Sequence, residues 1–318
     1  VFFDEVALMP ESFVNQATGR CSVQGSKYWF NCNPDGPYHW FKINWINKST
    51  GYLGKEKTEK IRAEATAKGQ EAGLKNILYV HFTMDDNLSL SEEIKARYRS
   101  MYTGVFFKRY ILGLWAMAEG IIYDMFDADK HVQKITDFFR RLKDGERYVS
   151  CDYGTQNATV FLLWNKGNNG KWYCVREYYY SGRAKGKQKT DGEYADDFEK
   201  WLDGVPIRAV IVDPAAASFI AELGKRGYRV LKADNDVEDG IREVASMLNM
   251  GLLVFCDTCI NTIMEFGSYI WDEKAAQRGE DRPVKENDHA MDAVRYFVYT
   301  ILSKRTGRVK NKAKYGFD

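Results

Sequence analysis

Short apolar runs separated by polar turns dominate the second half of the chain. These runs predict strands over residues 148–152, 158–164, 171–180, 208–212, 228–232 and 252–255. Helical periodicity follows over residues 191–202, 218–226, 237–249 and about 286–303. The first three strands have short connections, so we expect them to be antiparallel, while the later strands alternate with helices. The pattern predicts a mixed sheet with helices on both faces.

This order of elements is that of an RNase H-like α/β fold, which we expect over residues 147–303. In that arrangement the first and fourth strands are neighbours. The first half of the chain is less regular. Apolar runs at residues 1–3 and 28–30 predict buried strands, the second ending in a turn at 31–37. Residues 51–75 resemble a charged surface insertion, and 91–101 predict a helix.

Charge and composition indicate candidate binding residues only in two short stretches of the chain. The net charge of +2 neither demands nor excludes a nucleic-acid partner. Two stretches, 183–189 and 304–314, carry cations without acids, and either would contact phosphates or lie in solvent; the first contains Arg183, Lys185, Lys187 and Lys189. No run of about 20 apolar residues and no signal peptide is visible, so we expect a cytoplasmic protein without a membrane partner.

Acidic residues follow two of the predicted strands that should be neighbours. Asp152 ends the first strand and Asp213 ends the fourth. A single aspartate after a strand is also ordinary turn chemistry, so the pair carries the signal. The last helix adds Asp288, His289 and Asp292, and the two aspartates, four residues apart, share one helical face.

Such carboxylates suit Mg²⁺ or Mn²⁺, and two such ions hydrolyse phosphodiesters. We predict Asp152 as a bridging ligand, Asp213 and Asp292 as flanking ligands, and Asp288 as a further candidate. His289 would either polarise water or contact the scissile phosphate, or else pack as a structural side chain.

Several motifs together resemble the large terminase subunit of tailed phages, in the PBSX/SPP1-like branch. They are VFFDEVALMP, YWFNCNPDGP, HFTMDDNLSLSEEI, YTGVFFKRYILGLWAMAEGIIYDMFD, VSCDYGTQNATV, EYYYSGRAKGKQKTDGEYADDF, VIVDPAAASF and NDHAMDAVRYF. The resemblance implies a DNA-packaging motor whose C-terminal nuclease cuts concatemeric double-stranded DNA in the host cytoplasm. It assigns Asp152, Asp213 and Asp292 to the metal site, with His289 beside them. It implies the portal protein and the small terminase subunit as partners, with assembly into an oligomer on the portal from a monomer in solution.

The resemblance also divides the chain. Residues 1–118 would be the C-terminal remnant of a P-loop ATPase domain, 119–146 a linker, 147–303 the nuclease and 304–318 a basic tail. Asp4 and Glu5 match a Walker B strand, and Asn33 lies in the motif that couples hydrolysis to motion. Residues 181–192 match a loop that regulates DNA access. No G-x-x-x-x-G-K-[ST] occurs, so we predict that this chain neither binds nor hydrolyses ATP.

Two other functions fit parts of the pattern. A Holliday-junction-resolvase-like nuclease would share the fold, but the Walker-B-like opening argues against it. A non-catalytic packaging scaffold would not need acidic residues at all three motif positions.

Overall fold

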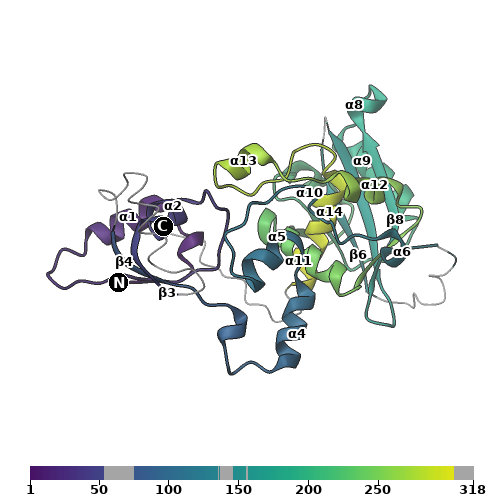
Figure 1. Cartoon of the computed structure of the whole chain (residues 1–318). Coiled ribbons are helices and arrows are strands. Elements are labelled where there is room, and N and C mark those ends of the chain that lie inside the picture. The colour runs from purple at the N-terminus through teal and green to yellow at the C-terminus, as the bar shows by residue number, and fades with distance from the viewer. Residues whose placement is uncertain (54–74, 135, 137–145, 155–156, 304–318) are drawn as a thin grey trace. The chain divides into compact units, whose positions relative to one another are not determined.

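The chain folds into two compact units in the computed structural model, which describes residues 1–53, 75–134, 136, 146–154 and 157–303 (Figure 1). The smaller unit contains Val1–Gly120 and Trp271–Arg282, and the larger contains Ile121–Ile270 and Pro283–Asp318. The predicted basic tail and most of the predicted insertion at 51–75 lie outside the described residues. Among the residues described, no helix is long and apolar enough to cross a bilayer.

The larger unit is built on a seven-stranded mixed sheet. Its order is β10 (Val230–Lys232), β9 (Ala209–Val212), β6 (Arg147–Asp152), β7 (Ala158–Lys166), β8 (Trp172–Ser181), β11 (Leu253–Cys256) and β5 (Val132–Gln133). The β6–β7 and β7–β8 pairs are antiparallel, and the other pairs are parallel. The predicted mixed RNase H-like sheet is confirmed, with the first and fourth expected strands, β6 and β9, side by side.

Side-chain alternation along β6 separates the two faces of this sheet. Val149 and Cys151 join a core formed with α9 (Asp191–Leu202) and α10 (Ala217–Lys225). On the opposite face the Ser150 hydroxyl accepts a hydrogen bond from the Trp164 indole, whose ring stacks on Phe297 of α14 (His289–Phe297) at 4.4 Å. Because residues two apart share a face, Asp152 points toward the α14 side.

Three further elements complete the face that α14 covers. Helices α11 (Val237–Asn249) and α12 (Ile260–Ser268) contact α14, and α14 continues into the π-helix η6 (Val298–Leu302). Figure 1 shows α14 beside β6, with α11 and α12 in the same unit.

Part of the expected linker belongs to this unit. Residues 121–134 include α6 (Ala128–His131) and the edge strand β5, which pairs with β11. Packing explains the difference, since the Phe126 ring stacks on Phe266 at 4.1 Å and the buried His131 hydrogen-bonds the Leu248 carbonyl at 3.0 Å.

The smaller unit has two separate pairs of parallel strands. β1 (Phe2–Phe3) pairs with β2 (Trp29–Phe30), and β3 (Ser49–Leu53) pairs with β4 (Lys75–Val80). Its core is largely aromatic, with Phe3, Val6, Val14, Phe41 and Trp45. The helices among its described residues are η1 (Val6–Leu8), α1 (Glu11–Gly19), α2 (Trp40–Asn44), η2 (Ile46–Lys48), η4 (Met84–Asp86), α4 (Glu92–Met101), α5 (Gly104–Phe106), η5 (Phe107–Ile111) and α13 (Glu273–Gln277).

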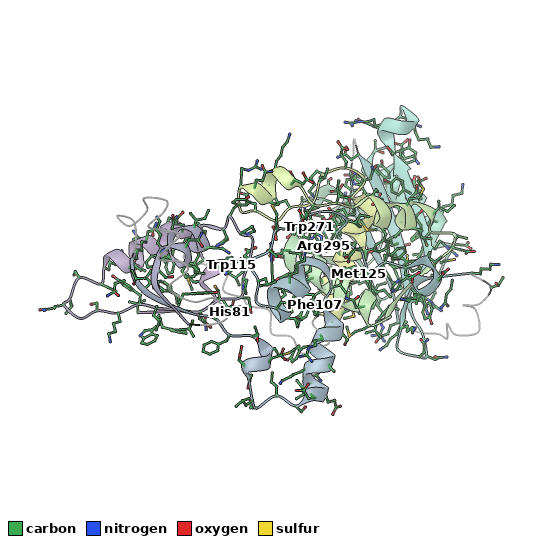
Figure 2. All side chains as sticks on the ribbon, in the orientation of Figure 1. His81, Phe107, Trp115, Met125, Trp271 and Arg295 are labelled. Carbon is green, nitrogen blue, oxygen red and sulfur yellow. The ribbon has the colours of Figure 1, made fainter. Side chains whose placement is uncertain are left out.

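The buried side chain of Arg109 links segments of the smaller unit that are far apart in the sequence. Arg109 pairs with Asp35 at 3.0 Å and also with Asp281, and it donates to the Ala116 carbonyl. Figure 2 shows His81 and Trp115 in the same unit, where His81 hydrogen-bonds the Gly113 carbonyl at 2.8 Å.

Candidate active site

A polar cleft of about 660 Å³ opens on the α14 side of the larger unit. Segments far apart in the sequence line it: the ends of β6, β8 and β9 and the start of α14. Its lining includes all five residues that the sequence predicts for metal binding and catalysis: Asp152, Asp213, Asp288, His289 and Asp292. The fold therefore gathers acidic groups from three distant segments.

Asp152 lies at the base of this group, largely buried at the end of β6. Its Oδ2 lies 2.9 Å from His289 Nδ1. Burial raises the pKa of Asp152 to about 6, and the charges of Asp292 and Asp288 add to the rise, while the hydrogen bond with His289 opposes it. Burial lowers the pKa of His289, but the bond to Asp152 and nearby acidic charge outweigh it and raise that pKa above its usual value.

Two cations balance the aspartates of α14. The buried Asp292 accepts a hydrogen bond from Arg295 Nη2 at 2.8 Å. Lys285 Nζ lies 3.1 Å from Asp288 and 3.5 Å from Asp292. Arg295, labelled in Figure 2, is only 2% exposed and also donates to the carbonyl of Asn235.

Asp213 has different hydrogen-bond partners from the other acids of the cleft. Its Oδ2 accepts a hydrogen bond from the Tyr296 hydroxyl at 2.6 Å, and its Oδ1 accepts one from the Ala215 N–H at 2.7 Å. The second bond is a local turn hydrogen bond, the alternative role that the sequence analysis gave to an aspartate after a strand. Within the described part of the chain, no three His, Cys, Asp or Glu side chains are positioned to hold one ion together. The predicted acids thus share a cleft but not a ready-made coordination shell.

Sequence reasoning missed several residues of the cleft. Arg295 and Tyr296 lie three and four positions after Asp292, so helical spacing could have found them. Lys285 lies three residues before Asp288, but nothing marks it in the sequence. Glu265 does not line the cleft but accepts hydrogen bonds from the start of α14, and nothing in the local sequence marks it either.

The four predicted DNA-contacting cations differ in their surroundings. Arg183 is exposed and lines the cleft, and Lys185 is exposed nearby on α8 (Gly182–Lys185). Lys187 is exposed and lies 3.8 Å from Glu193. Lys189 instead pairs with Asp197 and covers the Tyr180 ring at 4.0 Å, so its charge is already engaged within the protein.

The smaller unit brings together two of the residues matched to ATPase motifs. The Glu5 carboxylate lies 3.4 Å from both the backbone and side-chain nitrogens of Asn33, and its own N–H donates to Asn31. Glu5 adopts a left-handed conformation with φ 52°, which is uncommon outside glycine. Asp4 is exposed beside it.

The fold and this cleft define an RNase H-like α/β unit with an acidic site. No protein-family model matches the sequence. Over 95% of its length the chain is similar to the large terminase of a thermophilic bacteriophage, solved in complex with ADP, with 56% identity, a TM-score of 0.81 and coverage of 69% of that chain. Another structure of that terminase, with ATP-gamma-S, gives the same identity and TM-score over 70% of its chain.

A curated relative agrees. The terminase large subunit of Escherichia phage T5 is 26% identical over 316 residues, which cover 95% of this chain and 65% of the relative. The chain therefore spans about two thirds of the length of the proteins it matches. It belongs to the large terminases of tailed bacteriophages.

Proposed function

We propose that the larger unit is a metal-dependent endonuclease that cuts concatemeric double-stranded DNA during phage genome packaging. The observation that carries the proposal is the single cleft lined by Asp152, Asp213, Asp288, His289 and Asp292. Family membership supports it, because terminases are the proteins that the chain resembles over nearly its whole length. The same family membership argues against the alternative of a Holliday-junction-resolvase-like nuclease.

The chemistry of the cleft suits divalent cations. The four aspartates of the cleft would supply the oxygen ligands that Mg²⁺ and Mn²⁺ prefer. Burial raises the pKa of Asp152, and the negative charges of Asp292 and Asp288 raise it further, so a bound cation would favour its ionised form. Shared coordination also requires movement, because Asp213 is hydrogen-bonded to Tyr296. The donor set therefore fits such an ion once Asp213 turns away from that hydroxyl.

A divalent cation held there would activate water and stabilise the leaving oxygen of the phosphodiester. The protein's own groups have distinct tasks. The hydrogen bond between Asp152 Oδ2 and His289 Nδ1 fixes the orientation of the imidazole. Arg295 holds Asp292 in one rotamer from the buried side. Arg183, at the rim, is available for a DNA phosphate.

For the smaller unit we propose a role in the packaging motor. The contact between Glu5 and Asn33 joins the two matched motifs, as a coupling between nucleotide hydrolysis and motion requires. The large terminase of the thermophilic phage was solved with ADP and with ATP-gamma-S, and its 56% identity weighs against our expectation that this chain lacks ATPase function. The portal protein and the small terminase subunit are the partners we propose, in the host cytoplasm.

Plasmid cleavage tests the nuclease proposal. We expect the purified chain to nick supercoiled plasmid in the presence of Mn²⁺ and not in EDTA, and Asp152→Ala to abolish nicking. Asp203→Asn, at an exposed helix end, is the matched control and should leave the rate unchanged. Cutting that survives Asp152→Ala would refute the assigned site, and a wild-type chain that never cuts would favour the scaffold alternative.

A further inference from the structure

Helix α14 carries four of the residues that line the cleft, His289, Asp292, Arg295 and Tyr296, but its N-cap side chain does not cap its start. Its N-cap residue, Asp288, makes no side-chain capping bond, and its carboxylate faces Lys285 instead. The first N–H groups of a helix need acceptors from elsewhere. At α14 that acceptor comes from a different helix.

Glu265 of α12 supplies it. Its Oε2 accepts from the N–H of Ala290 at 2.7 Å and of Met291 at 3.2 Å. Its other oxygen, Oε1, accepts from the Tyr179 hydroxyl of β8 at 2.9 Å. The side chain is 4% exposed, so both oxygens serve the interior of the protein. A buried carboxylate is costly unless it is hydrogen-bonded, and these three bonds meet that need.

Helix α12 is itself anchored in the same manner. The Glu177 carboxylate, from β8, accepts from the N–H groups of Asn261 and Thr262 at 3.1 and 2.7 Å. Two glutamates therefore link the central sheet to α12 and α12 to α14. This series of hydrogen bonds ends at the N–H groups of Ala290 and Met291, the two residues that follow His289.

We propose that Glu265 is a positioning residue, which caps α14 from the neighbouring helix and thereby fixes where His289 and Asp292 enter the cleft. This inference rests on the proposed nuclease function. The cap leaves the Asp288 carboxylate free to face the cleft, because Asp288 is not needed to satisfy the helix end. It also holds the helix start where His289 reaches Asp152 at 2.9 Å.

Two conservative variants separate position from charge. Glu265→Gln keeps an oxygen that reaches both N–H groups but removes the charge. Glu265→Asp keeps the charge but withdraws the oxygens by one methylene. We expect Glu265→Asp to lower kcat for Mn²⁺-dependent cleavage roughly 10- to 100-fold, with the KM for DNA nearly unchanged, and to weaken Mn²⁺ binding measured by electron paramagnetic resonance. Glu265→Gln should stay within about threefold of wild type in both.

Hydrogen exchange supplies a readout independent of activity. Amides of residues 289–292 should exchange faster in Glu265→Asp than in Glu265→Gln. The matched control is Glu193→Asp, in the capping box of α9 on the other face of the sheet, which should leave kcat and Mn²⁺ affinity unchanged.

The outcomes are distinct. Wild-type kcat and Mn²⁺ affinity in Glu265→Asp would overturn the inference alone, and a loss confined to Glu265→Gln would assign the effect to charge instead of position. A wild-type chain that neither binds Mn²⁺ nor cuts DNA would overturn the proposed function and this inference together.

Discussion

Replacing the central acid, Asp152→Asn, should make the metal-free protein more stable while removing its response to metal. The rise in the pKa of Asp152 from 3.8 to about 6 corresponds to about 3 kcal/mol of cost for ionising it in the folded state. Asparagine avoids this cost, which is already net of the opposing hydrogen bond with His289. The expected gain is therefore about 3 kcal/mol, or roughly 6–12 °C in Tm for a unit of this size.

The pH dependence has a defined sign. A carboxylate whose folded pKa is raised destabilises the fold where it is ionised, so wild type loses stability as the pH rises from about 4 to about 6. The advantage of Asp152→Asn should therefore be complete above pH 6 and disappear toward pH 4. His289 remains in both proteins, but its pKa falls in Asp152→Asn because the interaction with Asp152 that raises it is lost, so the difference reports the Asp152–His289 pair.

Thermal unfolding in EDTA and in Mn²⁺, at pH 5 and pH 8, measures this effect. We expect Mn²⁺ to raise the Tm of wild type at pH 8 and to leave Asp152→Asn unchanged, with Asp203→Asn behaving as wild type. A variant that is less stable than wild type in EDTA at pH 8, or that Mn²⁺ still stabilises, would refute the reasoning.

Three further changes test the surroundings of the cleft. Arg295→Met leaves the buried Asp292 without its closest cation and should cost about 3–5 kcal/mol in urea unfolding; a loss below about 1 kcal/mol would contradict this. Gly240→Ala puts a Cβ 2.5 Å from Arg295 Cγ and should cost about 1–3 kcal/mol by the same assay, whereas an unchanged midpoint would show that the arginine yields freely. Arg183→Ala with Lys185→Ala should weaken duplex DNA binding and lower its salt dependence by about one to two ions in titrations at several salt concentrations, and an unchanged slope would remove these residues from the interface.

The sheet was predictable where local pattern and packing agree. The strands from β6 to β11 are apolar runs bounded by turns, and alternation along β6 sends Asp152 to the correct face. The edge strand β5 was missed because its two residues lie in a charged segment and gain their place only by pairing with β11. Helix α12 was missed for a related reason, since Glu177, 84 residues before Asn261, provides its cap.

The acids that line the cleft were predictable from the sequence, and the groups that balance their charge were not. Asp152 and Asp213 follow from strand ends, and Asp288 and Asp292 from helical spacing. Lys285 and Glu265 act through tertiary contacts that leave no periodic signal. The hydrogen bond between Tyr296 and Asp213 likewise depends on how α14 lies on the sheet, which the sequence alone does not give.

Anomalous diffraction from crystals soaked in Mn²⁺ tests the central claim most directly. We predict a manganese peak in the cleft within about 2.0–2.4 Å of carboxylate oxygens of Asp152 and of at least one of Asp213 and Asp292, with Asp213 turned away from Tyr296. A saturated crystal with no peak among these residues, or with manganese bound only elsewhere, would contradict a metal-dependent nuclease at this site.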